Sequence, residues 1–169
     1  MLGACVIIAA HSALAQAEFS PPFQFEPPPQ LERGSVTRSV AGSTYSYTST
    51  ETDASLRLLI TTMPVREITN SFGDLTAVQC INLFVGEVRN VHDDFFVVNQ
   101  ARPLSIAGTE FPQFRWTGKN LGRRLTGVLS CGRIQDWYLV IHFADETVNA
   151  ARNFADIRAR LRHMQVVAR

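Results

Sequence analysis

A run of strand-like segments between residues 111 and 143 constrains the fold more than any other feature of the chain. Its last segment, Trp137 to Phe143, carries apolar side chains at both odd and even positions, which is typical of a strand covered on both faces. Residues 123–131 indicate a neighbouring strand, because Leu125, Gly127, Leu129 and Cys131 fall at alternate positions and would lie on one side of it. Turns are predicted at residues 118–122 and 132–136, where glycines interrupt the pattern. We therefore expect an antiparallel meander with a central last strand.

Further strands are expected before the meander. Residues 42–50 place tyrosines at alternate positions among Ser and Thr, which fits a strand with one solvated face. Residues 56–63 alternate in the same way, and residues 51–54 form a plausible turn between the two. Shorter extended segments are expected at residues 95–98 and 103–106.

Two helices are expected around these strands. Residues 68–92 carry apolar side chains at spacings of three and four, the pattern of one helix face. The residues able to cap its start are Thr69, Asn70 and Ser71. The second helix follows the meander, with Asp145 as its predicted N-cap.

The order of these elements predicts the fold class. Two amphipathic helices each need an apolar surface, and a sheet offers one on each face. We therefore expect an α+β fold in which helices pack on an antiparallel sheet as an α/β/α sandwich. A chain of 169 residues with 46% hydrophobic side chains has room for one such domain, which we place at residues 36–169.

The N-terminal residues have the pattern of a secretory signal peptide. Residues 2–10 are apolar, and Ala15-Gln16-Ala17 supplies the small residues that signal peptidase requires, so cleavage is expected after Ala17. No Lys or Arg precedes the apolar run, which is the one missing element. Cys5 fits the letters of a lipobox, but it precedes the apolar run instead of following it. The run is too short to cross a bilayer and no second candidate follows. The expected location is periplasmic or secreted, with no transmembrane segment after cleavage.

Residues 18–35 are rich in proline, which disfavours helix and sheet and predicts an extended tether between the cleavage site and the domain. Phe19, Phe23 and Phe25 lie within this segment, and a solvated linker has no need of aromatic side chains. We interpret these three as possible contacts to a partner. The alternative is that they lie on the surface of the domain itself.

Two cysteines, Cys80 and Cys131, remain after the predicted cleavage. An even number of cysteines in an oxidising compartment predicts a disulfide. A bridge of this span would stabilise the fold by about 4 kcal/mol on the chain-entropy model. The alternative is two buried free thiols.

No catalytic or ligand-binding motif stands out. A nucleophilic site would use Cys131 with His142 as its base, since a meander brings neighbouring strands together. A metal site would use residues 92–94, His-Asp-Asp, although His92 at a helix end is explained by the helix dipole alone. No cofactor motif is present, so we predict no catalytic residue, no metal site and no cofactor. The 16 basic and 15 acidic side chains nearly balance, which argues against a nucleic-acid partner.

The chain resembles the Mog1/PsbP-like α/β/α sandwich superfamily across roughly residues 36–167. The resemblance lies in the order of elements and in four segments, residues 56–64, 127–131, 137–143 and 154–161. It implies the same layered fold and a non-enzymatic accessory or binding role. The superfamily includes a Ran-binding factor and extrinsic photosystem subunits. No functional residue is carried over, because no site motif of the superfamily is matched.

These observations predict an exported, non-enzymatic accessory or binding protein that acts on a protein or envelope component. The alternative class is an enzyme, a hydrolase that uses Cys131 and His142. A third class is an inhibitor or immunity-type protein that forms a tight one-to-one complex with one enzyme.

Overall fold

The structure, a computed structural model, describes residues 21–52 and 54–167. Its largest element is a seven-stranded antiparallel sheet with the strand order β2-β3-β4-β8-β7-β6-β5. β8 lies in the middle of the sheet, which confirms the prediction from its two apolar faces. The strands are β2 (Leu31–Ser39), β3 (Gly42–Ser49), β4 (Arg57–Pro64), β5 (Asp93–Ile106), β6 (Thr109–Asn120), β7 (Arg123–Ile134) and β8 (Trp137–Glu146).

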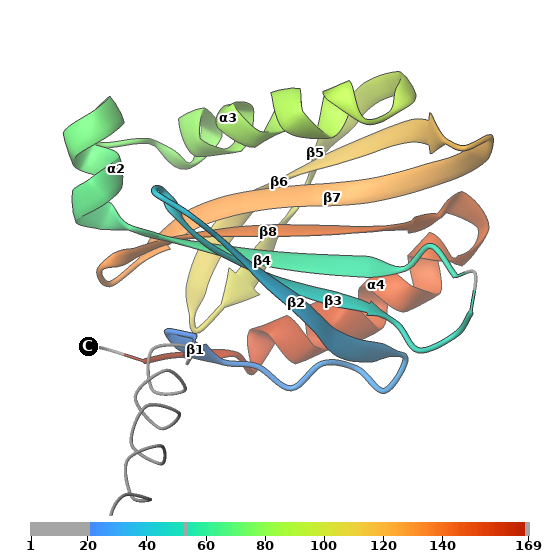
Figure 1. Ribbon diagram of the computed structural model, residues 1–169, viewed down its shortest axis with the longest axis horizontal. Helices are drawn as coiled ribbons and strands as arrows, with labels where there is room; N and C mark the ends of the chain where they lie inside the picture. Colours follow the sequence, from blue (N-terminus) through green and yellow to red (C-terminus); the bar gives the residue numbers. More distant parts are fainter. Residues whose placement is uncertain (1–20, 53, 168–169) are drawn as a thin grey trace, which may run out of the picture.

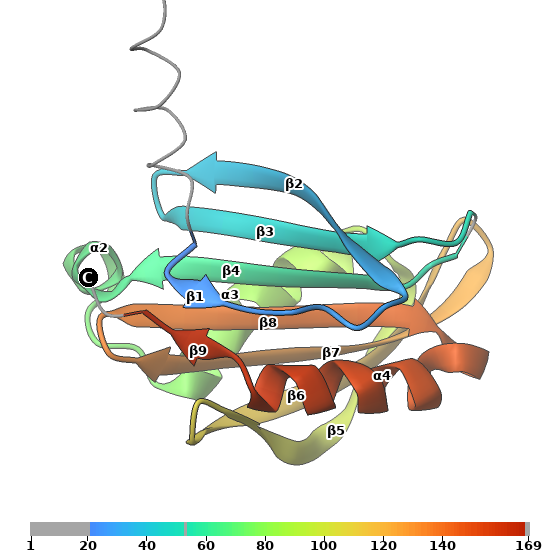
Figure 2. The same cartoon turned by 90° about the horizontal axis from the view of Figure 1, so that it is seen from below.

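The helices cover opposite faces of this sheet, as Figure 1 shows. α2 (Val65–Phe72) and α3 (Ala77–Asn90) follow β4 on one face, and α4 (Thr147–Arg162) lies across the other. A small second sheet pairs β1 (Phe23–Gln24) with β9 (Gln165–Val166) on the same side as α4 (Figure 2). The architecture is an α/β/α sandwich, which confirms the predicted α+β class.

The α4 face holds the larger apolar core. Phe154, Ile157 and Leu161 project from one side of α4 and are buried against the sheet. The rings of Phe143 and Phe154 meet edge to face with centroids 4.8 Å apart, an arrangement that aromatic pairs favour. This face is therefore held mainly by burial of apolar surface.

The α3 face is held by a smaller apolar cluster and by one covalent bond. Ile68 on α2 and Ile81 on α3 are buried with Val140 of the sheet. A disulfide joins Cys80 on α3 to Cys131 on β7, with their Cα atoms 6.0 Å apart. The predicted bridge is therefore present, and it fixes α3 to the sheet.

The interpretation of residues 18–35 as a tether is wrong for residues 21–35. Phe23 is only 2% exposed, and its ring meets that of Tyr45 edge to face at 5.1 Å. Phe25 contacts Tyr47 in the same way at 5.3 Å. The prolines keep this segment extended, and the extended chain packs on the α4 face before entering β2 at Leu31. Phe23 is therefore part of the core and Phe25 packs against it, so neither the partner contact nor a position on the domain surface describes Phe23.

The predicted signal peptide, its cleavage site and Phe19 lie outside the described residues. Within the part of the chain that is described, no helix is both long and apolar enough to cross a bilayer.

The single helix predicted over residues 68–92 is two helices. Gly73 has a φ of +74° and ends α2, because a glycine adopts this conformation without a steric cost. Thr76 then begins α3 with a capping box, in which it exchanges hydrogen bonds with Gln79. None of Thr69, Asn70 and Ser71 caps a helix start.

Four boundaries also differ from the prediction. The turn predicted at residues 132–136 is shorter, because β7 continues to Ile134 and leaves only Gln135 and Asp136 before β8. Asp145 is buried within β8, and α4 has Glu146 as its N-cap, without a side-chain cap hydrogen bond. The two short segments at residues 95–98 and 103–106 are parts of one strand, β5. The turn after β6 is shorter than residues 118–122, because Leu121 and Gly122 alone have positive φ there, which matches a two-residue hairpin turn.

Candidate binding sites

One end of the sandwich gathers four connections: the β3–β4 loop, the α3–β5 junction, the β6–β7 turn and the β8–α4 junction (Figure 1). The antiparallel register places them together, since Ala144 of β8 pairs with Arg57 of β4 and with Gly127 of β7. Two pockets open at this end, one toward α4 and one toward the end of α3. Ala54 and Ser55 of the β3–β4 loop line both pockets.

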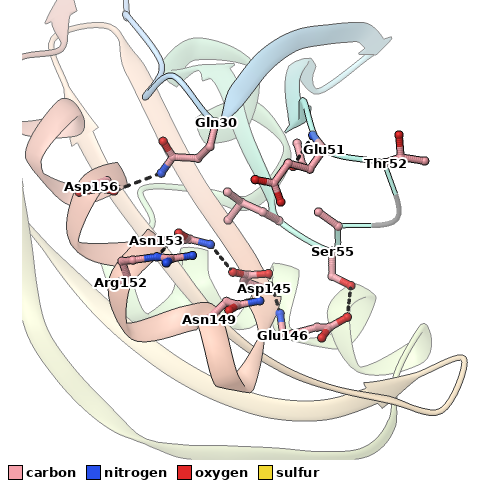
Figure 3. Close-up of a pocket in the computed structure, with 13 residues that line it drawn as sticks. Gln30, Glu51, Thr52, Ser55, Asp145, Glu146, Asn149, Arg152, Asn153 and Asp156 are labelled. Carbon is pink, nitrogen blue, oxygen red and sulfur yellow. Dashed lines mark hydrogen bonds between the residues drawn. The ribbon is translucent and has the colours of Figure 1, made fainter.

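The acidic pocket lies toward α4 and has a volume of about 470 Å³. Figure 3 shows polar side chains converging on it from the β3–β4 loop, the β8–α4 junction and α4. Its charged lining residues are Glu51, Asp145, Glu146, Arg152 and Asp156.

The carboxylates of Asp145, Glu146 and Asp156 in the acidic pocket already have donors. Asn153 donates to Asp145 at 2.7 Å, and Gln30 donates to Asp156 at 3.2 Å (Figure 3). Among the described residues, no group of three or more His, Cys, Asp and Glu side chains is arranged to hold a metal ion. We interpret this pocket as a polar joint that ties α4 to the sheet and to the segment before β2.

The second pocket, here called the His142 pocket, has a volume of about 690 Å³, within the range of small-molecule sites. Apolar side chains from three strands contribute to its wall: Leu59, Leu125 and Ala144. Val91 and Leu121 line it as well and are largely exposed. The polar lining residues are Ser55, Arg57, His92, Asn120, Arg123 and His142.

A cluster of three rings lies behind this pocket. The Trp116 ring centroid is 4.5 Å from that of His92 and 5.7 Å from that of His142. Gly127 on β7 leaves room for the indole, because a Cβ atom there would overlap the ring. His142 Nε2 and Trp116 Nε1 are shielded from water and have no hydrogen-bond partner. Buried polar atoms without partners are rare in native proteins and each one requires an explanation.

Burial, and to a lesser extent the charge of nearby His92, lowers the pKa of His142 to about 4. Burial acts in this direction because it disfavours the charged imidazolium. His142 is therefore neutral at physiological pH. The Nδ1 atom of His92 lies 2.7 Å from the carbonyl oxygen of Val88, so the His92 side chain contacts the last turn of α3.

An ion pair separates the two pockets. Arg123 Nη1 donates to Glu146 Oε1 at 3.0 Å, and Ser55 Oγ donates to the same oxygen at 3.3 Å. Arg57, at the mouth of the His142 pocket, is exposed and makes no ion pair or hydrogen bond with other described residues. The guanidinium of Arg57 is therefore available to solvent or to a ligand.

A third feature is the free edge of the sheet at β5. Phe96, Val97 and Val98 are 66%, 45% and 51% exposed. Three consecutive exposed apolar side chains place apolar surface on both sides of the strand. The pairing of β5 with β6 is also irregular, with three register shifts between residues 93 and 104.

Cys131 and His142, the pair that the alternative hydrolase would use, do not assemble as a nucleophile and a base. The Cys131 sulfur is bonded to Cys80, so no thiolate is present in this state. His142 lies on the same face of the sheet but opposite Leu129, while Cys131 lies opposite Val140. Of the residues 92–94 that were considered as a metal site but not predicted as one, Asp94 forms an ion pair with Lys119.

Sequence analysis missed Arg57 and Trp116 as site residues. Trp116 was predicted only as part of an extended segment, and Arg57 as a polar position of a strand. Their meeting with His142 depends on the register of β4, β8, β7 and β6. The one available signal is Gly127, a glycine inside a strand, which often marks close approach by another group.

No protein-family model matches the chain, and no curated protein matches it significantly in sequence. The similarity to solved structures is clearer. Cyanobacterial PsbP (CyanoP) from Synechocystis superimposes with a TM-score of 0.57 at 10% identity, covering 86% of each chain. The Ran-binding protein Mog1p of Saccharomyces cerevisiae gives a TM-score of 0.52 at 11% identity, over 86% of this chain and 90% of that one.

A third solved structure is LpqN, described as involved in cell envelope biogenesis of Mycobacterium tuberculosis. It gives a TM-score of 0.51 at 11% identity, over 86% of this chain and 83% of that one. Likenesses at such low identity establish the fold and not the function. The predicted resemblance is confirmed at that level: this chain has the Mog1/PsbP-like fold.

Proposed function

We propose that this chain is an exported, non-enzymatic accessory protein that binds a protein partner through the free edge of β5. The observation that carries the proposal is the exposure of Phe96, Val97 and Val98 on a strand that ends the sheet. An exposed apolar edge strand is a template for another strand. A partner strand added there gains main-chain hydrogen bonds from β5 and contacts to its apolar side chains.

The opposite edge of the sheet supports this choice of surface. β2 is also an edge strand, but its exposed positions carry polar and charged side chains such as Glu32, Arg33 and Arg38. Charged residues on an edge strand are a common protection against association. One edge is thus protected by its sequence, while the other presents apolar side chains to solvent.

Export is supported by two separate features. The sequence ending in Ala15-Gln16-Ala17 has the pattern of a signal peptide, and a disulfide joins Cys80 to Cys131. Disulfides of this kind persist in oxidising compartments outside the cytosol. Similarity to an envelope-biogenesis protein such as LpqN is compatible with a partner in the envelope.

The non-enzymatic part of the proposal is supported by the state of Cys131. The alternative hydrolase requires the Cys131 thiolate as its nucleophile, and that sulfur is held in the disulfide. An inhibitor or immunity-type protein would also bind a protein, but it would form a stable complex with one enzyme.

The test is site-specific photo-crosslinking in living bacteria that express the full chain. A photoreactive amino acid at position 97 should give one reproducible protein adduct, and the same residue at position 40 should give none. Val40 is the matched control because it is fully exposed and lies in the β2–β3 turn, away from β5. The double variant Phe96→Lys/Val98→Lys, with the crosslinker still at position 97, should remove the adduct.

The control variant Val40→Lys should keep the adduct, and circular dichroism should show that all variants remain folded. Equal adducts from positions 97 and 40 would contradict the proposed surface. An adduct between two copies of this chain would contradict the accessory role and identify the edge as a self-association site. Intact mass of the same protein tests export: a mass that begins at Glu18 supports it, and an unprocessed chain contradicts it.

A further inference from the structure

We infer that the His142 pocket binds a small anionic molecule that joins a carboxylate to an apolar body. Arg57 holds the carboxylate at the mouth, and the apolar body lies on Leu59 and Leu125. This inference goes beyond the proposed partner surface at β5 and does not depend on it.

Charge at the pocket selects the sign of the ligand. Among the described residues that line it there is no Asp or Glu, whereas two are arginines, Arg57 and Arg123. Arg123 is partly compensated by Glu146, but Arg57 has no charged partner among the described residues. A free guanidinium is a preferred group for a carboxylate because its N–H donors match both carboxylate oxygens.

The wall of the pocket selects an apolar body. Leu59, Leu125 and Ala144 come from three strands of the sheet, so this part of the wall is rigid. Val91 and Leu121 extend the apolar surface to the rim, where both are exposed. A rigid apolar wall with a few polar groups at one side is the usual composition of a small-molecule site.

The two pockets differ in whether their charged side chains already have partners within the protein. Asp145 and Asp156 there are already bonded to Asn153 and Gln30, so their hydrogen bonds hold the fold together. In the His142 pocket the guanidinium of Arg57 at the mouth has no charged partner among the described residues.

The test uses three probes with the purified, disulfide-bonded protein. Octanoate has both the carboxylate and an apolar chain. Octanamide has the same chain with an uncharged amide in place of the carboxylate, and acetate has the carboxylate without the chain. Binding is followed by NMR at near-neutral pH through the backbone amides of the pocket. Octanoate should shift the amides of Leu59, Leu125 and His142 and reach saturation. Octanamide should bind about tenfold more weakly, and acetate should cause no saturable shift.

Variants separate recognition of the charge from burial of the apolar body. Arg57→Gln should weaken octanoate binding about tenfold and leave octanamide binding unchanged. Arg33→Gln is the matched control, since Arg33 is an exposed arginine on β2 outside the pocket, and it should change neither affinity. Ala144→Met partly fills the pocket and should weaken both ligands.

Equal affinity for octanoate and octanamide would overturn the inference, as would saturable shifts confined to another part of the molecule. Octanoate binding that survives Arg57→Gln unchanged would overturn the assigned role of Arg57, and absence of any saturable binding would overturn the site. The edge variant Phe96→Lys/Val98→Lys should still bind octanoate, so the outcome is separate from that of the partner proposal.

Discussion

The two faces of the central sheet are stabilised in different ways. On the α4 face, buried side chains from the sheet, α4 and the segment before β2 form one continuous apolar core, in which Phe143 and Phe154 pack edge to face. On the α3 face, the apolar residues fall into two smaller clusters. A disulfide fixes α3 there. Buried polar atoms without a partner occur on both faces: on Trp116 and His142 here, and on Gln113, which follows Phe111 on the α4 side of β6.

This difference indicates a division of roles. A continuous apolar core supplies stability without any special chemistry. On the α3 face the buried apolar surface is divided between two smaller clusters, and the disulfide adds a covalent constraint. The pocket with unpaired Arg57 opens on the α3 side, so the face that carries the disulfide is also the one with a candidate ligand site.

The largest effect should follow removal of the disulfide. Cys80→Ala/Cys131→Ala should lower the free energy of unfolding by about 4 kcal/mol, because the bridge closes a long loop in the unfolded chain. Urea denaturation measures the loss, and hydrogen exchange locates it. If the α3 face depends on the bridge, amides of α3 should lose protection before those of α4. Equal loss of protection in both helices would remove the distinction between the faces.

The second effect is a pH dependence that arises from His142 on the α3 face. The pKa of His142 is lowered from 6.5 to about 4 in the folded state, so the unfolded chain binds a proton over this range and the folded chain does not. Stability should therefore be full above about pH 6.5 and fall by up to about 3 kcal/mol as the pH drops to about 4.

His142→Phe should flatten this part of the stability profile, measured by urea denaturation at several pH values. It should also leave stability at neutral pH unchanged or higher, since the variant removes a buried polar atom without a partner. His163→Gln, at the end of α4, is the control for general effects of losing a histidine. A profile that stays unchanged in His142→Phe would contradict the assignment.

A third effect tests whether the α4 face has a polar anchor of its own. Asn153→Ala removes the donor that lies 2.7 Å from the buried carboxylate of Asp145. The free energy of unfolding should fall by about 2 kcal/mol, the usual range for a hydrogen bond to a charged group. Asn149→Ala is the matched control on the same helix, because Asn149 is exposed and makes no side-chain hydrogen bond with described residues. Equal effects of the two variants would show that the α4 face relies on apolar contacts alone.

Much of the sheet could be predicted from the sequence because its strands bury one or both faces. β8 was identified as central from apolar residues at every position, and Cys80 and Cys131 were paired from their number and compartment. β2 was missed for the opposite reason, since a strand exposed at nearly every position shows no alternation. The proline-rich segment was misread because composition predicts an extended chain but not what that chain packs against.

The candidate sites were less predictable because they form between elements. His142 and Trp116 meet through the register of three strands, and Arg57 reaches the same pocket from a fourth. No spacing along the chain encodes such a meeting. The prediction of a single helix over residues 68–92 was wrong for a related reason. α2 and α3 bury apolar side chains against the same face of the sheet, so the helical spacing of apolar residues continues across the break at Gly73.

The smallest expected effect concerns the break between α2 and α3 on the α3 face. Thr76 accepts a hydrogen bond from the Gln79 amide at 3.2 Å and caps α3. Thr76→Ala should lower the free energy of unfolding by about 1 kcal/mol, and Thr76→Ser should restore most of it. Thr69→Ala is the control, since Thr69 lies inside α2 and bonds only the exposed Asp74 through its side chain. A continuous helix capped at Thr69 would reverse the order of the two losses, so urea denaturation of this pair decides where α3 begins.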